Sequence, residues 1–412
     1  MPTIAILGTL DTKGAEHAFV ADQIRARGLE VLPIDVGTLG APTITPHIAS
    51  ATVAVAGGGD VLALAERRDR GEAVATMVRG APIVVSQLAA EGRIHGIISL
   101  GGGGGTAIAT AAMRALPLGF PKLMVSTLAS GNTSPYVDVK DIVMFPSIVD
   151  VAGLNRISRL LLSRAAGAIC GMVETTPPAA TDRPVVVASQ FGNTTPCVDR
   201  CRRQLEEAGF EMLIFAAVGT GGRTMESLIQ SGLVAGVLDL TTTEWADELV
   251  GGVLGAGPTR LEAAARAGVP AVVSTGCLDM VNFGPPESVP THFRGRTFYQ
   301  HNPQVTLMRT TLAENRELGL ILATKLNLST GPVTVLLPLR GGSMISAPGQ
   351  PFHDPEADAA LYESLKVNLR RDIPVLELDC LINDPEFADA SVRELKHNME
   401  SAAASKERDT SV

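Results

Sequence analysis

A run of five glycines is the feature of this sequence that most directly suggests ligand chemistry. The run, Gly101–Gly105, follows the apolar segment Gly96–Leu100 and precedes Thr106 and a helical pattern. Without side chains, backbone N–H groups can crowd around a bound anion, and the start of the helix adds a partial positive charge. The run therefore predicts a phosphate-binding turn. A turn in close contact with another domain is the structural alternative, since glycine marks close backbone approach of any kind.

The same run partly matches the turn that binds dinucleotides. Gly102, Gly104 and Ala107 satisfy the G-x-G-x-x-A form. The acidic residue expected at the end of the following strand is missing, because that strand ends Val125-Ser126-Thr127. An NAD(P)-dependent oxidoreductase is therefore less favoured than an ATP-binding protein.

Two further turns place polar groups at strand ends. Residues 8–14 read Gly-Thr-Leu-Asp-Thr-Lys-Gly at the carboxyl end of the first predicted strand, the usual ligand edge of an open α/β sheet, but lack Walker A spacing. Asp11 could hold Mg²⁺ through water and Lys13 could meet a phosphate, whereas helix capping by Asp11 or Thr12 is the competing interpretation. Asp35, at the end of the second strand, could accept a ribose hydroxyl or simply form a turn.

These turns, together with a hydroxyl-rich segment after the fourth strand, predict a binding site for ATP with Mg²⁺. The metal is expected at Asp11. The predicted nucleotide-binding residues are Gly8, Thr9, Asp11, Thr12, Lys13, Asp35, Gly37, Thr38, Gly101, Gly102, Gly103, Gly104, Gly105, Thr106, Thr127, Ser130, Gly131 and Asn132.

The second half carries acids and bases that suggest a second site. Acids can act in proton transfer, histidine titrates near neutrality, and arginine grips carboxylate or phosphate. We therefore expect, as the alternative function, a kinase, lyase or isomerase acting on a small anionic or phosphorylated metabolite at the interdomain cleft. Capping and interdomain hydrogen bonds would use the same residue types. The predicted catalytic residues are Glu244, Asp279, His301, Arg309 and Arg340.

The elements that position these residues follow a regular pattern. Apolar runs of strand length alternate with helical patterns, which predicts βαβ units and parallel sheets. Landmarks recur in the same order in both halves: Ile4–Leu7 is answered by Val185–Ala188, and Asp35–Thr38 by Ala217–Thr220. We expect two Rossmann-like α/β domains, each an open, mostly parallel sheet flanked by helices, related by internal duplication.

The predicted domains span residues 1–178 and 179–412, with the boundary in a polar, proline-containing segment. The first domain carries about 40 extra residues between matched landmarks, which we interpret as a helical insertion near residues 41–90. The second continues into a C-terminal extension that has no counterpart in the first.

The amino-acid composition indicates which classes of protein this chain can belong to. Hydrophobic residues make up 45% of the chain and aromatics only 4%, which favours cores of Val, Ile, Leu and Ala. A net charge of −9 disfavours nucleic acid and anionic membranes as partners. The start of the chain lacks a secretory pattern and no long apolar run stands out, so a membrane-spanning protein is not expected. Five cysteines form no disulfide framework and fit the cytoplasm.

Several of these segments resemble one known family, and the similarity extends over almost the whole chain. It rests on Gly8–Lys13, Gly101–Thr106, His301–Thr311 and Ala347–Asp358. The sequence is similar to bacterial, fungal and plant proteins related to the ATP-binding inhibitory domain of the tomato mosaic virus resistance protein. The resemblance implies two Rossmann-like subdomains, ATP with magnesium in the first, and a homodimer. Some microbial relatives accompany a TIM-barrel domain, which for this chain would be a separate partner protein.

Overall fold

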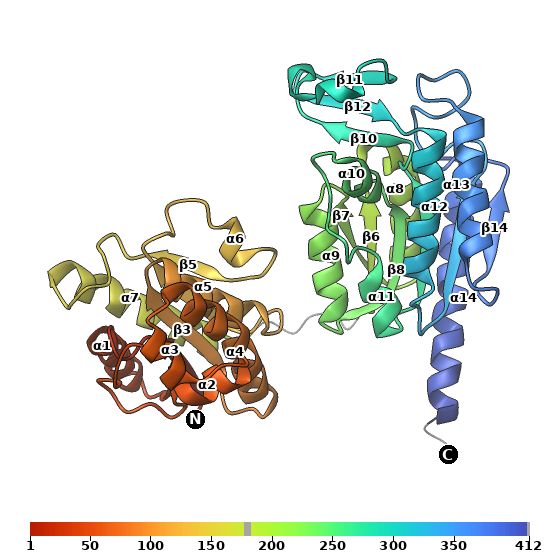
Figure 1. The fold of residues 1–412 in the computed structure, drawn as a ribbon. Helices are drawn as coiled ribbons and strands as arrows, with labels where there is room; N and C mark the ends of the chain where they lie inside the picture. Colours follow the sequence, from red (N-terminus) through yellow and green to blue (C-terminus); the bar gives the residue numbers. More distant parts are fainter. Residues whose placement is uncertain (177–182, 410–412) are drawn as a thin grey trace. The chain divides into compact units, whose positions relative to one another are not determined.

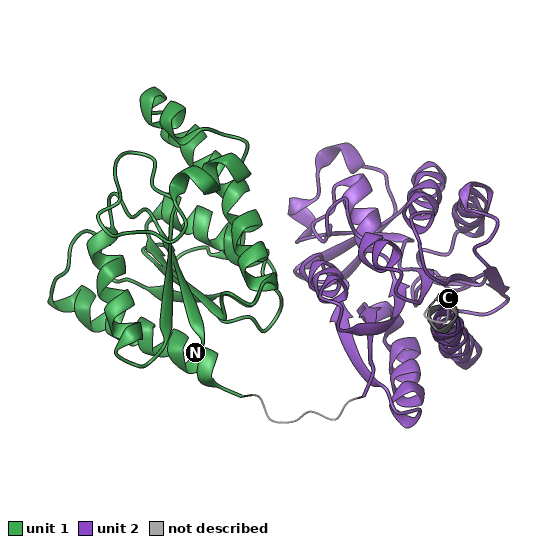
Figure 2. Cartoon of the chain, turned by 90° about the horizontal axis from the view of Figure 1, so that it is seen from below, with its two compact units in different colours: residues 1–179 green, residues 180–412 purple. Residues whose placement is uncertain are grey.

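The computed structural model describes residues 1–176 and 183–409, which form two α/β units (Figure 2). The units comprise residues 1–179 and 180–412; the predicted boundary between residues 178 and 179 lies outside the described residues. Each unit contains a parallel sheet with helices on both faces. The predicted fold class, two Rossmann-like α/β domains, is therefore confirmed.

The first unit is built on a five-stranded parallel sheet in the order β2-β1-β3-β4-β5 (Figure 1). Its central strands are buried along almost their whole length, as apolar parallel strands covered on both faces must be. The strands are β1 (Thr3–Gly8), β2 (Glu30–Asp35), β3 (Gly96–Gly101), β4 (Lys122–Ser126) and β5 (Val143–Pro146). The helices are α1 (Gly14–Arg25), α2 (Ser50–Ala56), α3 (Val61–Arg67), α4 (Arg70–Ala90), α5 (Gly103–Arg114), α6 (Ser134–Val137) and α7 (Arg156–Glu174).

Two apolar clusters hold the first unit together, one on each face of the sheet. Helices α1 and α7 cover one face, where Ile24 and Ile169 pack on Ile4 and Ile98. Helices α2, α4 and α5 cover the other. Three helices, α2 to α4, thus separate β2 from β3, in the region where the sequence suggests a helical insertion.

Helix α4 is long and apolar enough, by length and composition alone, to cross a membrane. A core helix of a soluble protein passes the same test. Its residues Ala73, Met77, Ala81 and Val85 are buried against the first unit's sheet and neighbouring helices, so core packing accounts for its apolar character.

The second unit contains a six-stranded parallel sheet in the order β14-β13-β9-β8-β6-β7 and a three-stranded antiparallel sheet in the order β10-β12-β11. The strands are β6 (Val185–Gln190), β7 (Glu211–Ala216), β8 (Val234–Thr241), β9 (Ala271–Gly276), β10 (Met280–Phe283), β11 (Phe298–Asn302), β12 (Val305–Arg309), β13 (Val333–Pro338) and β14 (Val375–Leu378). The α-helices are α8 (Thr195–Glu207), α9 (Thr220–Gln230), α10 (Glu244–Val250), α11 (Glu262–Ala267), α12 (Leu312–Leu326), α13 (Pro355–Asn368) and α14 (Pro385–Asp409).

Read in chain order, the first five strands of both parallel sheets follow the order 2-1-3-4-5. In each unit the chain therefore reverses direction across the sheet between its first and third strands, which opens a crevice at their carboxyl ends. Unrelated doubly wound sheets share this order. Internal duplication therefore stays a prediction.

The second unit closes its crevice. Figure 1 shows β10, β11 and β12 over the carboxyl ends of the parallel strands. A small apolar cluster joins this sheet to the loops after β9 and β13; it includes Cys277, Met280, Leu307 and Phe352. The amide of Asn193, after β6, also contacts the Met280 sulfur at 3.8 Å. The ligand edge of this sheet is therefore occupied by the protein itself.

Candidate functional site

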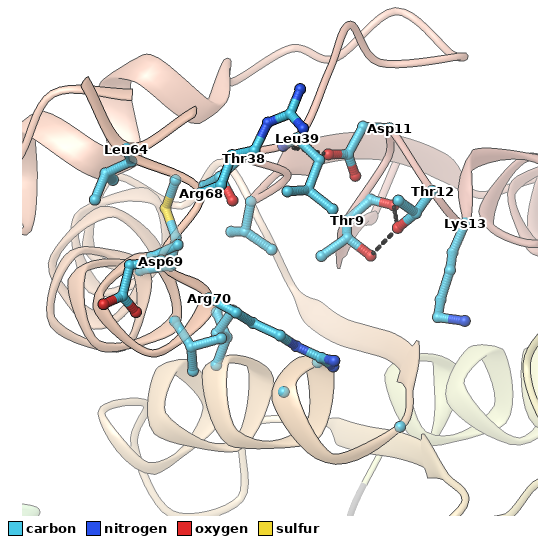
Figure 3. Close-up of a pocket in the computed structure, with 18 of the residues that line it drawn as sticks. Thr9, Asp11, Thr12, Lys13, Thr38, Leu39, Leu64, Arg68, Asp69 and Arg70 are labelled. Carbon is cyan, nitrogen blue, oxygen red and sulfur yellow. Dashed lines mark hydrogen bonds between the residues drawn. The ribbon is translucent and has the colours of Figure 1, made fainter. Parts of the chain in front are cut away.

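The crevice of the first unit is a cavity of about 480 Å³ at the carboxyl ends of β1 and β3 (Figure 3). Five chain segments that are distant in sequence line it: the turns after β1, β2 and β3, the junction of α3 with α4, and the loop after β5. Of the predicted nucleotide-binding residues, those that line the cavity are Thr9, Asp11, Thr12, Lys13, Thr38, Gly102, Gly104 and Gly105.

The turns after β1 and β2 are joined by Asp35. Its Oδ1 accepts hydrogen bonds from the amides of Leu10 at 3.0 Å and Gly37 at 2.8 Å. Asp35 is buried and is not among the residues that line the cavity. Burial raises the pKa of Asp35 above its ordinary value, and the two amides oppose that shift. The residue thus positions the turns, which differs from the ribose contact that the sequence suggests.

Asp11 lines the cavity, and one of its two carboxylate oxygens has no hydrogen-bond partner among the described residues. Oδ2 accepts the Leu39 amide at 2.9 Å, whereas Oδ1 is buried and has no hydrogen-bond partner among the described residues. A Cβ on Gly37 would lie 2.5 Å from that carboxyl group. Glycine at position 37 is therefore needed to let Asp11 approach the second turn.

Lys13 and Gly8 help to hold the turn after β1 in place. The Lys13 ammonium donates to the carbonyl of Val151, so it ties the turn after β1 to the loop after β5. Gly8 leaves room for the ring of the buried His17, whose Nε2 would lie 2.0 Å from a Cβ at position 8. Burial lowers the pKa of His17, which therefore stays neutral at pH 7.

The glycine run forms the end of β3 and the start of α5. Gly102 is the N-cap residue and Gly103 the first residue of the helix. The N–H groups of a helix's first turn have no carbonyl to bond within the helix. None of Gly102–Gly105 has a positive φ, and a Cβ there would meet only ordinary contacts, or at Gly103 nothing within 4 Å. Neither backbone conformation nor packing requires these four glycines.

The insertion supplies cations that the sequence did not single out. Arg68 ends α3 in the left-handed conformation with φ 52°, and Asp69 caps α4 by accepting the Glu72 amide. This sharp junction directs Arg70 across the cavity toward the glycine run (Figure 3). The Arg70 Nη2 atom lies 3.8 Å from the position of a Cβ on Gly104. The sequence signal was the Arg-Asp-Arg triplet between two helical patterns.

One wall of the cavity is apolar. Side chains from the turn after β2, from α3, α4 and α5 form it, namely Val36, Leu39, Leu64, Ala73, Val74, Met77 and Ile108. The cavity thus brings together the first amides of α5, Arg68, Arg70 and the unpartnered carboxylate oxygen of Asp11. Its apolar wall suits a planar, weakly polar group.

Other predicted binding residues lie outside this cavity. Thr106 is buried, with its hydroxyl 2.7 Å from that of Ser126. Thr127 and Ser130 line a separate basin after β4. The Asn132 side chain accepts from Ser134 in the next turn. The remaining predicted residues that do not line the cavity are Gly8, Gly37, Gly101, Gly103 and Gly131.

The predicted catalytic residues of the second unit do not form one site. Glu244 is buried and accepts from the Gly219 amide at 2.7 Å and from Arg260 at 2.7 Å. Arg260 also pairs with Asp239 and Glu226. The carboxylate therefore caps α9 and neutralises a buried cation, which is a structural role.

Asp279 and Arg309 do lie close together. Arg309 is buried and pairs with Asp358 at 2.6 Å, and Asp279 accepts from Ser343 at 2.8 Å. Burial raises the pKa of Asp279 to about 6, with the Arg309 charge opposing the shift. His301 and Arg340 are instead exposed, outside this pair.

Models of two protein domains match this chain. Residues 2–178 match "Uncharacterised protein family (UPF0261) N-terminal domain", and residues 183–399 match the corresponding C-terminal domain. The chain belongs to the UPF0261 family. The UPF0261 protein of Clostridium tetani is 50% identical over 96% of this chain and 99% of its own length.

The tomato relative links UPF0261 to the resemblance seen in the sequence. The ToMV resistance protein Tm-1(GCR237) of Solanum lycopersicum is 38% identical over 95% of this chain, which spans 55% of the tomato protein. Among solved structures, UDP-N-acetylglucosamine 2-epimerase from Rickettsia bellii aligns at 11% identity over 66% of this chain and 78% of its own, with a TM-score of 0.23. That score is too low to support an argument about function.

Proposed function

We propose that the first unit binds ATP with Mg²⁺ and holds the phosphates at the N-terminus of α5. The observation that carries the proposal is the run Gly102–Gly105. Its glycines are required by neither φ nor packing, and Gly102, Gly104 and Gly105 line the cavity. A phosphate that must reach the backbone amides gives a physical reason for the absent side chains at these three positions.

The second unit offers a comparison within the same chain. At the start of α9, a Cβ on Gly221 would lie 1.8 Å from the Ala216 carbonyl, and one on Gly222 2.1 Å from the Glu244 carboxylate. Packing therefore accounts for those glycines, and the protein's own carboxylate accepts the amides of Gly219 and Gly222. The N-terminus of α5 has the same glycine character but no internal anion among its described hydrogen-bond partners.

The other walls support a nucleotide over a bare phosphate. A volume of about 480 Å³ is in the range of small-molecule sites, and the apolar wall suits a base. Arg70, which takes part in no described ion pair, can form charge-assisted hydrogen bonds to phosphate oxygens.

The residues present also fit Mg²⁺. This ion is commonly bound by one or two carboxylates together with substrate phosphates and waters. Asp11, whose buried Oδ1 has no hydrogen-bond partner among the described residues, is the candidate ligand. Among residues 1–176 and 183–409 no cluster of three acidic, His or Cys side chains could hold a metal without such help.

A thermal-shift series on the full chain with ATP, ADP, AMP, NAD⁺ and NADPH, each with and without Mg²⁺, tests the proposal. We expect the largest stabilisation from ATP with Mg²⁺, as ligand linkage requires. Stabilisation by NAD⁺ or NADPH alone would favour the oxidoreductase. No shift with any nucleotide would reject the proposal and favour an enzyme acting on a phosphorylated metabolite.

The family resemblance further supports a cytoplasmic homodimer, with a TIM-barrel protein as a separate partner. Sedimentation analysis of the purified chain tests the dimer. A monomer at micromolar concentration, with and without ATP, would reject it.

A further inference from the structure

A second basin lies on the other side of the glycine run. It has a volume of about 460 Å³ and is formed by the loops after β4 and β5. Gly102, which lines the first cavity, would place a Cβ 3.6 Å from the Thr127 hydroxyl, which lines the basin. Asp150 borders both spaces. The two cavities are therefore neighbours across one turn of backbone.

The basin has a distinct chemistry. Its polar lining residues are Ser126, Thr127, Ser130, Ser147 and Asp150, with no Lys or Arg. The Ser126 hydroxyl is already paired with that of Thr106. An anion would meet one negative charge and no cation there. Hydroxyl groups, which both donate and accept, instead match a ligand that carries hydroxyls of its own.

Ser147, one of the residues that line the basin, has a hydroxyl without a hydrogen-bond partner among the described residues. The residue is 6% exposed, and its Oγ is buried without a hydrogen-bond partner among the described residues. A buried hydroxyl that lacks a partner costs free energy. A void of about 10 Å³ beside Ser147 is at most large enough for one water. Ser147 also lines the basin, so a ligand there lies next to this residue.

The backbone next to Ser147 is held in a rare conformation. The Val149 amide donates to the Ser147 carbonyl at 2.7 Å, which makes a γ-turn around Ile148. Ile148 has φ 62° and is 72% exposed. A β-branched residue with positive φ is strained. This turn sets the conformation of the loop that carries Ser147 and Asp150.

We infer that this basin binds a small hydroxylated molecule, such as a polyol or sugar, as acceptor of the terminal phosphoryl group of the nucleotide. The inference rests on the proposed ATP site. The acceptor oxygen forms a bond to the terminal phosphorus as the bond from that phosphorus to the bridging oxygen breaks, which releases ADP. Asp150, between the two cavities, takes the proton of the acceptor hydroxyl.

The experiment uses the full chain, ATP labelled at the terminal phosphate, Mg²⁺, and glycerol, D-ribose and myo-inositol as probes at millimolar concentration. Label transfer to a probe is measured by chromatography and ATP binding by calorimetry. The test variant is Ser147→Ala. The matched control is Ser99→Ala, because Ser99, in β3, is likewise a buried serine with an unpartnered hydroxyl but lines neither cavity.

We expect transfer to at least one probe. Ser147→Ala should raise the KM for that probe about 2-fold to 10-fold, the effect of one lost hydrogen bond, with ATP affinity unchanged. Ser99→Ala should change neither value. Bound ATP without transfer to any probe, or transfer that Ser147→Ala and Ser99→Ala affect equally, would overturn the inference. Failure of the wild-type chain to bind ATP would instead overturn the proposed nucleotide site.

Discussion

Replacing Gly104 by alanine tests the role of the glycine run with the least disturbance to the fold. A Cβ at this position would lie 3.4 Å from the Val74 methyl and 3.8 Å from the Arg70 Nη2 atom, both ordinary contacts within the cavity. Gly103→Ala is the matched control, because its Cβ would meet nothing within 4 Å and Gly103 does not line the cavity. Both substitutions make the same chemical change in the same helical turn.

The two variants should have the same stability and different affinity. Alanine favours helix over glycine by up to about 1 kcal/mol, so neither variant should lower the Tm. At position 104 the proposed site predicts that the methyl group would keep a phosphate oxygen from the helix amides. A hydrogen bond to a charged group contributes about 1.5 to 3 kcal/mol. Since about 1.4 kcal/mol corresponds to tenfold in Kd, loss of one such bond weakens ATP binding by about 10-fold to 150-fold.

Isothermal titration calorimetry with ATP and Mg²⁺ measures the difference directly. Gly103→Ala should bind as the wild type does. If Gly104→Ala also binds ATP with wild-type affinity, the phosphates do not lie on the first turn of α5. Equal loss in both variants would show that the helix start is disturbed as a whole, and the reasoning from cavity lining would be wrong.

Three other substitutions test other parts of the account. Arg70→Ala should weaken ATP binding at least about tenfold and AMP binding less, because its guanidinium points toward the glycine run, where the proposal places the phosphates; equal effects on both nucleotides, measured by calorimetry, would contradict this. Arg260→Met should lower the free energy of unfolding in urea by about 3 to 5 kcal/mol, since it leaves three buried carboxylates without their cation; a loss below about 1 kcal/mol, the range of surface pairs, would contradict it. Burial raises the pKa of Asp247 to about 7. The folded chain therefore binds a proton that the unfolded chain releases at lower pH, and stability should fall as pH rises from about 4 to 7. Asp247→Asn should flatten this decline in urea unfolding, because an amide side chain does not titrate. The Asn282 amide can turn to present its unpartnered oxygen to the new side chain. Parallel pH profiles would contradict the assignment.

The sequence predicted the part of the site that follows directly from strand ends. The turns after β1 and β3 each follow an apolar run, and parallel strands bring their carboxyl ends to one edge. The sequence alone therefore places Thr9, Asp11 and Gly104 together, and all three line one cavity.

The rest depends on packing that no local pattern records. Arg70 lies on the insertion, more than 30 residues before Gly104, and Asp150 lies after the last strand of the unit. The ion pair of Glu244 with Arg260 could not be predicted from the sequence either, because only the fold of the second unit brings the two residues together. The Glu244 carboxylate also lies at the start of α9, where it accepts the amides of Gly219 and Gly222.

Hydrogen exchange of the full chain with and without ATP and Mg²⁺ shows whether the nucleotide binds at the start of α5, because it locates the amides that ATP protects. We expect ATP to slow exchange in the peptides covering Gly102–Thr106 and Thr9–Lys13, with little change in the second unit. Protection confined to the second unit, or binding of ATP without protection of the start of α5, would contradict it.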